Sequence, residues 1–318
     1  AVFGEAFWLA NVDSGGIANF QTIFNLITAI VLIPFAGWLV KLSVLLVKED
    51  APVEDRHPEL HTLDEKLYIS PAVALSEATK AVAFMGGIAK ENFARCCNVL
   101  LKGDESHLEL IDSEEECLDQ FADRSDRFLI GLTKAAETEM DDRQVDMLLQ
   151  TVPSFERVGD YGTNMVELAQ RLQNEKGSFS ENAKRELRIL CQAVAEILDI
   201  TVEAFESNNI DKAKRIEPLE ETIDDMVQML RDRHTQRLKA GTCTIGTGLV
   251  FMEALTHLER TADHCSSIGV MMLARENDAI MYNHHKFLHE LHTGDDATYL
   301  AESQRRRAQY LDPLNDLQ

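Results

Sequence analysis

The chain has 318 residues, of which 31 are Lys or Arg and 54 are Asp or Glu, so its formal net charge is −23. A chain this acidic repels phosphate backbones, which argues against a nucleic-acid-binding role. Hydrophobic residues make up 45% of the sequence, enough for a folded core, and the small numbers of proline (7) and glycine (16) disfavour an all-β fold built on many tight turns.

A long apolar run opens the chain. Residues 17–40 contain no charged side chain, and about 20 such residues suffice to cross a bilayer. We therefore expect a transmembrane helix over about 17–47, at the end of a membrane part that covers 1–48. Lys41 and Lys48 follow the run, so the positive-inside rule places the rest of the chain in the cytoplasm.

The first half of this run is unusually polar. Thr22, Asn25 and Thr28 fall near one helical face, because residues three or four apart share a side of a helix. Polar groups in hydrocarbon are costly, so this face predicts other membrane helices or a polar cavity beside it, and a longer protein around the given sequence. The alternative is a single anchor whose polar half lies among the lipid headgroups.

A linker is predicted over 49–69, since residues 49–62 carry two prolines and mixed charge. Apolar residues then recur with helical period and indicate a bundle. A helical tail over 277–318 follows, and it contains a basic run, Arg305–Arg307. The bundle would occupy 70–276, with helices over 70–102, 106–138, 140–174, 179–207, 209–239 and 245–276.

The predicted bundle contains an internal duplication. SFERVGDYG at 154–162 pairs with HLERTADHC at 257–265, and EEECLDQF pairs with LEETIDDM at an offset of 105 residues. Helices one to three and four to six are thus two copies of one unit. The predicted fold is all-α, a transmembrane helix followed by a six-helix bundle made of two three-helix repeats. These repeats cover about 70–174 and 179–276.

Acidic pairs with a spacing of four residues recur in both copies. Each pair aims two carboxylates at one place, and such pairs destabilise a bare helix by about 0.2–0.5 kcal/mol. A multivalent cation would offset this repulsion, so the pattern predicts metal ligands. The candidates are Glu156, Asp160, Glu259 and Asp263 in the third helices and Glu115, Asp119, Glu220 and Asp224 in the second helices.

A solvated acidic face is the alternative for these pairs, because a chain with 54 acids produces the spacing by chance. Arg157 and Arg260 follow the glutamate in each copy and suit either interpretation. His264 is a possible extra ligand. The Glu54-x-x-His57 spacing in the linker is discounted because Pro58 follows at once.

The segments FERVGDYGTNMVELA and HLERTADHCSSIGV resemble the third-helix signatures of the PhoU domain family, and IANFQTIFNLITAIVLIPF resembles the final membrane segment of bacterial type II sodium–phosphate cotransporters. The order of membrane segment, linker and two PhoU-like repeats matches cotransporters that carry such a domain at the C-terminus. Gln21 stands where that segment commonly has histidine. Gln21 and Asn25 are the candidate residues of a transport path.

The resemblance implies the C-terminal fragment of a sodium-dependent phosphate symporter in the inner membrane, with a cytoplasmic regulatory domain. Its partners would be inorganic phosphate, sodium and the lipid bilayer, and a homo-oligomer is left open. In PhoU-like proteins the acidic motifs bind multinuclear metal clusters, of the iron or zinc class. The alternative function is a membrane-tethered signalling adaptor without transport.

An enzyme is not expected, because the sequence offers no nucleophile–base set and no histidine-rich ligand set. The six cysteines form no C-x-x-C motif and lie beside apolar residues, which indicates buried, reduced thiols.

Overall fold

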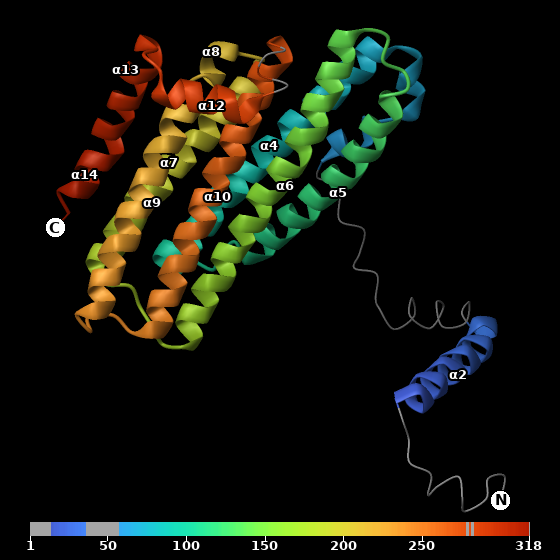
Figure 1. The fold of residues 1–318 in the computed structure, drawn as a ribbon, viewed down its shortest axis with the longest axis horizontal. Coiled ribbons are helices and arrows are strands. Elements are labelled where there is room, and N and C mark those ends of the chain that lie inside the picture. Colours follow the sequence, from blue (N-terminus) through green and yellow to red (C-terminus); the bar gives the residue numbers. More distant parts are fainter. Residues whose placement is uncertain (1–13, 36–56, 278–279, 281–282, 318) are drawn as a thin grey trace, which may run out of the picture. The chain divides into compact units, whose positions relative to one another are not determined.

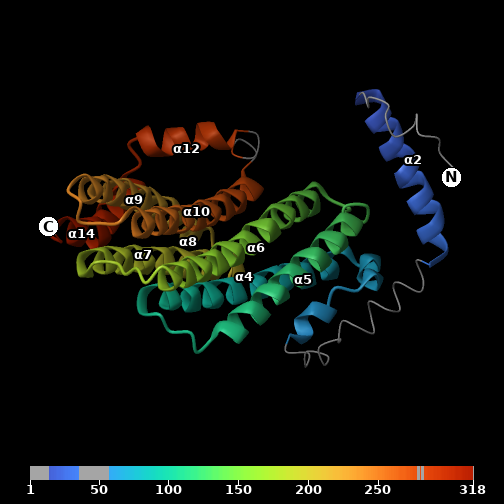
Figure 2. The same ribbon diagram turned by 90° about the horizontal axis from the view of Figure 1, so that it is seen from below.

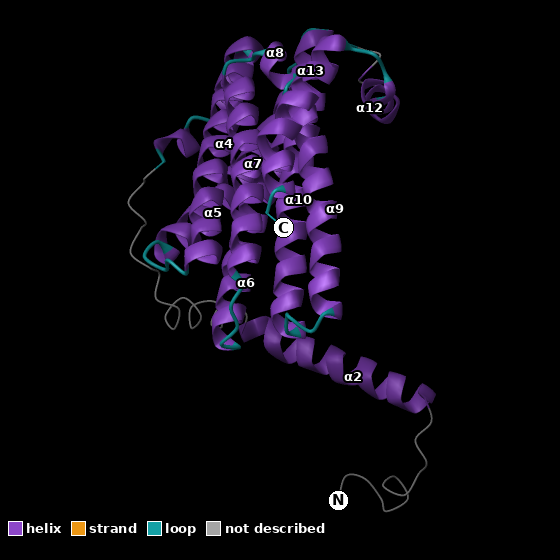
Figure 3. Cartoon of the chain, turned by 90° about the vertical axis from the view of Figure 1, so that its left-hand side faces the viewer, coloured by secondary structure: helices purple, strands orange, loops and turns teal. Residues whose placement is uncertain are grey.

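The computed structural model describes residues 14–35, 57–277, 280 and 283–317, and within them it contains helices and no strand (Figures 1 and 3). The predicted all-α fold is therefore confirmed. The chain divides into two compact units, Ala1–His57 and Pro58–Gln318.

Among the residues of the first unit that the structure describes, 14–35 and 57, there is one long helix. Helix α2 spans Ser14–Leu32 and continues into a 3-10 turn, Ile33–Phe35. The remainder of the predicted transmembrane segment, 36–47, lies outside the described residues. Apolar side chains of α2 are more than half exposed on several sides of the helix, among them Phe20, Ile23, Phe24, Leu26, Ile27 and Ile30.

The second unit is a bundle of six long helices (Figure 1). In the first repeat they are α4 (Pro71–Lys102), α5 (Leu108–Leu132) and α6 (Glu139–Asn174). In the second repeat they are α7 (Glu181–Glu206), α9 (Ile216–Lys239) and α10 (Ile245–Glu276). Five of the six cysteines are buried and all six are free, as the sequence predicted.

The two repeats pack through equivalent helices. Helix α6 lies between α4 and α10, and α7 contacts both α4 and α10 (Figure 2). The crossing of α4 and α6 is close because Gly86 has no side chain: a Cβ there would lie 2.7 Å from the Phe155 ring. Phe155 itself is fully buried. The apolar stripes of the six helices thus form one shared core.

Two predicted helix boundaries were wrong. The second helix, expected over 106–138, ends at Leu132, with Thr133 at its C-cap. Thr138 then caps the next helix in a reciprocal capping box with Asp141, so the predicted helix could not have run through it. The fifth helix, expected over 209–239, is divided into α8 (Ile210–Ala213) and α9. Pro218 lies in the first turn of α9, where a missing backbone N–H is tolerated.

The end of the predicted linker is ordered on the bundle. The short helices Pro58–His61 and Glu65–Ile69 pack on α4 and α5. The Tyr68 hydroxyl donates to the Phe128 carbonyl over 2.9 Å, and the two rings lie 5.0 Å apart. Of the predicted linker, residues 49–56 lie outside the described part of the chain.

The C-terminal tail packs on the second repeat. It comprises α12 (His284–Thr293), α13 (Ala297–Arg306), a π-helical turn (Arg307–Leu311) and α14 (Asp312–Asn315). Arg306 is fully buried and pairs with Glu196, while Leu314 is fully buried against the main core. All three arginines of the basic run form ion pairs within this unit: Arg305 with Glu302, Arg306 with Glu196 and Arg307 with Asp225.

Among the described residues, one helix is long and apolar enough to cross a membrane, and it is α4. Half of its most apolar window is buried inside the bundle, so its hydropathy is explained by the core. The apolar stretch of α2 among the described residues is shorter, Asn19–Val31, and does not reach that length. A membrane span in the first unit stays a prediction.

Candidate metal centres

The acidic pairs of the first repeat converge between α5 and α6. One carboxylate oxygen each from Glu115, Asp119 and Asp160 lies within 4.8 Å of the others. The two helices approach closely here because Gly159 has no side chain, and a Cβ there would lie 2.6 Å from Leu118. Three of the four predicted residues of this repeat therefore form one group.

Glu156, the fourth residue, extends this group by one helical turn. Burial raises its pKa, and the charges of Asp160, Asp119 and Asp126 raise it further. Burial and then the Asp119 charge likewise raise the pKa of Asp160. The pKa of Glu115 rises through burial and then through Asp119 and Asp160. The carboxylates thus repel one another across the helix pair.

Asp126 is a further carboxylate of this group that the sequence analysis missed. It lies two turns after Asp119 on α5 and acts on Glu156. Its spacing of seven residues from Asp119 places both on one face of the helix and could have revealed it.

The equivalent residues of the second repeat converge between α9 and α10. Oxygens of Glu220, Asp224 and Asp263 lie within 4.8 Å of one another. Burial, followed by the charges of Glu217 and Asp224, raises the pKa of Glu220 to about 9. Burial, followed by Asp263 and Glu259, raises the pKa of Asp224 to about 6. The ionised forms of Glu220 and Asp224 are therefore disfavoured first by burial and then by the neighbouring carboxylates.

Glu259, the fourth residue of this repeat, is held differently. Both of its oxygens accept from Arg231, Oε1 from Nη1 over 3.1 Å and Oε2 from Nη2 over 2.5 Å. Arg231 Nη2 also donates to the Thr256 hydroxyl over 3.3 Å. This bidentate pair neutralises Glu259, and the sequence analysis did not foresee it.

Glu217 is another acidic residue that the sequence analysis missed. It is 7% exposed, so its charge needs partners. The Ser266 hydroxyl donates to one of its oxygens, and His292 Nε2 of the tail lies 2.8 Å from the other. Its position three residues before Glu220 was the available signal.

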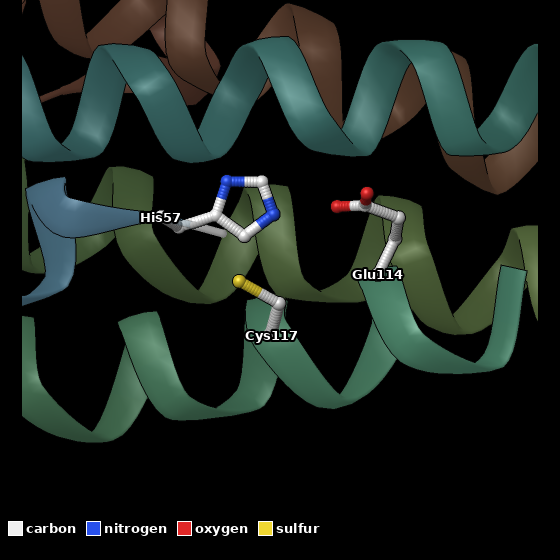
Figure 4. A group of neighbouring side chains, drawn as sticks. All are labelled: His57, Glu114 and Cys117. Carbon is white, nitrogen blue, oxygen red and sulfur yellow. The ribbon is translucent and has the colours of Figure 1, made fainter. Parts of the chain in front are cut away.

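The other candidate donors lie outside these two groups. His264 packs against the Tyr161 ring at 5.8 Å, and burial, with Arg157 and Arg260 nearby, lowers its pKa. Figure 4 shows Glu114 and Cys117 projecting from the same side of α5; His57, the third residue drawn, belongs to the first unit.

The transport-path candidates lie on α2. Gln21 and Asn25 are one helical turn apart and exposed, so they share a face of that helix.

The ligand atoms of the two groups determine which cations could bind there. All are carboxylate oxygens, the ligands of hard divalent cations and of carboxylate-bound iron in helical bundles. Zinc sites usually contain cysteine or histidine, which neither group provides. In the first group the Glu115, Asp119 and Asp160 carboxylates lie within 4.8 Å of one another, and Glu156 lies one helical turn before Asp160. In the second group Glu259 is already neutralised.

The fold and this site define a class: an all-helical bundle of two three-helix repeats with a carboxylate group in each. The PhoU domain matches residues 82–169 and 187–271, which together exceed half of the chain. The chain therefore belongs to the PhoU domain family.

Solved structures agree with this assignment of the fold. The chain is similar to the PhoU regulatory protein of the Streptococcus pneumoniae phosphate transport system, with a TM-score of 0.59, 20% identity and coverage of 66% of this chain and 98% of that one. Pseudomonas aeruginosa PhoU gives a TM-score of 0.59 and 20% identity, over 64% of this chain and 97% of that one.

Curated relatives fall into two kinds. A PhoU homologue of the phosphate-specific transport system in Thermotoga maritima is 25% identical over 126 residues, 40% of this chain and 53% of the relative. YjbB of Salmonella typhimurium, named as a proposed inorganic phosphate export protein, is 20% identical over 266 residues, 81% of this chain and 47% of the relative. The chain thus spans about half the length of these two relatives.

Proposed function

We propose that the chain is the C-terminal part of a sodium-dependent inorganic phosphate symporter, with α2 in a transmembrane helix over about 17–47 and the PhoU bundle as a cytoplasmic regulatory domain. The observation that carries this proposal is the presence, in one chain, of a PhoU bundle and a helix with exposed apolar side chains. Exposed apolar area costs about 25 cal/mol per Å² in water, which a bilayer offsets.

Phosphate as the cargo is supported by the relatives. The match to YjbB covers 81% of this chain, more than the PhoU repeats alone, and that relative is named for inorganic phosphate export. Sodium coupling rests on the resemblance of the α2 segment. Gln21 and Asn25 are the residues of α2 that we assign to the transport path.

The acidic groups of the bundle are assigned to cation binding, with regulation of the membrane part as the consequence. The Glu115, Asp119, Asp126, Glu156 and Asp160 carboxylates would hold the cations and remove the mutual repulsion that raises the pKa values of Glu115, Glu156 and Asp160. The bundle itself performs no chemistry on a substrate.

Transport by the whole protein, reconstituted in liposomes and followed with radiolabelled phosphate, tests the function. We expect phosphate to move only when a sodium gradient is imposed, and Asn25→Ala to slow that movement. Movement without sodium would contradict the symporter.

Absence of phosphate movement would favour the second candidate, a membrane-tethered adaptor. The accessory proteins among the relatives favour this candidate, since they are named for phosphate transport systems. An adaptor would retain the PhoU bundle at the membrane and change phosphate uptake by another carrier when the chain is deleted from cells.

Metal content tests the assignment of the acidic groups. We expect Glu156→Gln to lower the divalent metal retained by the purified chain. Glu167→Gln is the matched control, since Glu167 is an exposed glutamate of the same helix. Equal metal content in the two variants would contradict the assignment.

A further inference from the structure

Helix α12 of the tail lies beside the second repeat without packing closely on it (Figures 2 and 3). Its apolar residues Phe287, Leu288 and Leu291 line a cavity of about 760 Å³, and no described residue of α12 is buried. Helices in direct contact bury such side chains against each other. Space therefore remains between α12 and the bundle, and we call it the tail cavity.

The other walls of the tail cavity are apolar as well. They include Ile216 of α9, Val270 and Leu273 of α10 and Ala301 of α13, and most of the lining surface is apolar. Ligand sites in proteins measure about 300–1,000 Å³ and combine apolar walls with a few polar groups. The tail cavity has the size and the lining of such a site.

The acidic side chains of the lining already have partners. Glu217 accepts from the Ser266 hydroxyl, and Asp211 lies 3.1 Å from the Lys214 ammonium group. Asp296 accepts from two backbone N–H groups in the first turn of α13. These carboxylates are engaged within the fold, which disfavours a cationic ligand.

Two arginines of the lining have donors to spare. Arg215 Nε lies 3.4 Å from one oxygen of Glu302, and Arg305 Nη1 lies 3.5 Å from the other. Glu302 accepts a shorter bond, of 2.8 Å, from the fully buried Arg306. A guanidinium carries five N–H donors, and among the described residues Glu302 is the partner of both Arg215 and Arg305. The cavity therefore combines apolar walls with an under-used pair of cations.

We propose that the tail cavity binds a long-chain fatty acid, with its hydrocarbon chain between α10 and α12 and its carboxylate at Arg215 and Arg305. The two guanidiniums already lie on either side of one carboxylate, that of Glu302, so their arrangement suits a second group of the same kind. Each methylene moved from water into the cavity strengthens binding about fourfold. The ligand would join the tail to the second repeat, and neither phosphate nor metal enters this inference.

Photolabelling of the whole protein in lipid nanodiscs tests the proposal. The probe is hexadecanoic acid with a diazirine near the end of its chain, and the labelled peptides are mapped by mass spectrometry. We expect label on α10 and α12, displaced by unlabelled hexadecanoate. Hexadecanol, which has the same chain without the charge, should displace it at least about tenfold less effectively.

Variants of the two arginines test the carboxylate site. Arg215→Gln and Arg305→Gln should each raise the probe concentration for half-maximal labelling about tenfold, because each removes a charged donor. Arg127→Gln is the matched control, since Arg127 is an exposed arginine that pairs with a carboxylate on α5. Circular dichroism verifies the fold, and the hexadecanol comparison tests the carboxylate site without any substitution.

A second pair of variants tests the cavity itself. Ala301→Trp places a large side chain in the tail cavity from an exposed position of α13 and should abolish the label on α10 and α12. Ala297→Trp is the control, because Ala297 is also exposed on α13 but does not line the cavity.

The outcomes separate this inference from the proposed function. Label on α10 and α12 that responds to Ala301→Trp and to both arginines supports it. Label that responds to Ala301→Trp alone, with hexadecanol as effective as hexadecanoate, would replace the fatty acid by an uncharged apolar ligand and overturn the proposal. Absence of label from α10 and α12, or equal label in the two tryptophan variants, would also overturn it. Phosphate movement and metal content are separate measurements that none of these outcomes changes.

Discussion

Helices α2 and α4 are both apolar, but many apolar side chains of α4 are buried, whereas those of α2 are exposed. Helix α4 has a window of mean hydropathy 1.2, and half of that window is buried in the bundle. Its Phe93 is 1% exposed, whereas Phe24 of α2 is 58% exposed. An apolar sequence alone therefore does not reveal whether the side chains of a helix are buried in a core.

The largest expected effect contrasts these two phenylalanines. Phe93→Ala should lower the free energy of unfolding of the bundle by about 3–5 kcal/mol, because it leaves a cavity in a packed core. Phe24→Ala should leave the denaturation midpoint of the bundle unchanged. Urea titration followed by circular dichroism measures both, and equal losses would break the contrast between α2 and α4.

A charge in α2 should act on membrane retention instead of folding. Ile27→Lys should cost about 2.5–3.5 kcal/mol of insertion free energy if this residue lies near the bilayer centre. Alkaline extraction of membranes measures the loss. Ile130→Lys is the control, since Ile130 is a similarly exposed isoleucine of the bundle, and an equal loss there would refute a membrane role for α2.

Two adjacent glycines of α4, Gly86 and Gly87, differ in how closely neighbouring atoms approach them, so their variants test the packing of this helix. Gly86→Ala places a Cβ 2.7 Å from Phe155 and should cost about 1–3 kcal/mol through overpacking. Gly87→Ala meets nothing within 4 Å and should be neutral or stabilising, because alanine favours helix. Thermal melting of the two variants should therefore diverge; coincident melting would mean that α4 is not packed as described.

The last comparison concerns the partly buried acidic residues between α9 and α10. The pKa of Glu220, raised by burial to about 9, means that folding disfavours its ionised form. Between the unfolded pKa and about 9 the folded state holds more protons, so stability should fall as pH rises through this window. Melting temperatures of the metal-free chain should show this decline, Glu220→Gln should flatten it, and added divalent cation should reverse it.

The sequence predicted the helical class, the duplication and the acidic pairs because these follow from local periodicity. Heptad-like apolar spacing gives helices and their buried faces, and residues four apart share a face whatever surrounds them. Three predicted carboxylates of each repeat indeed lie together. The helix boundaries at Leu132 and before Pro218 were missed, since capping and first-turn chemistry compete with an apolar pattern that continues across them.

Only the tertiary structure determines which charged side chains contact one another. Arg231 reaches Glu259 from a different helix, and Glu217 is buried beside a tail residue, His292. Arg306, from the basic run of the tail, is buried and pairs with Glu196 of α7. Each of these contacts joins residues from separate helices, so no local spacing encodes it. The burial that distinguishes α4 from α2 has the same origin, because exposure is a property of neighbours and not of the helix itself.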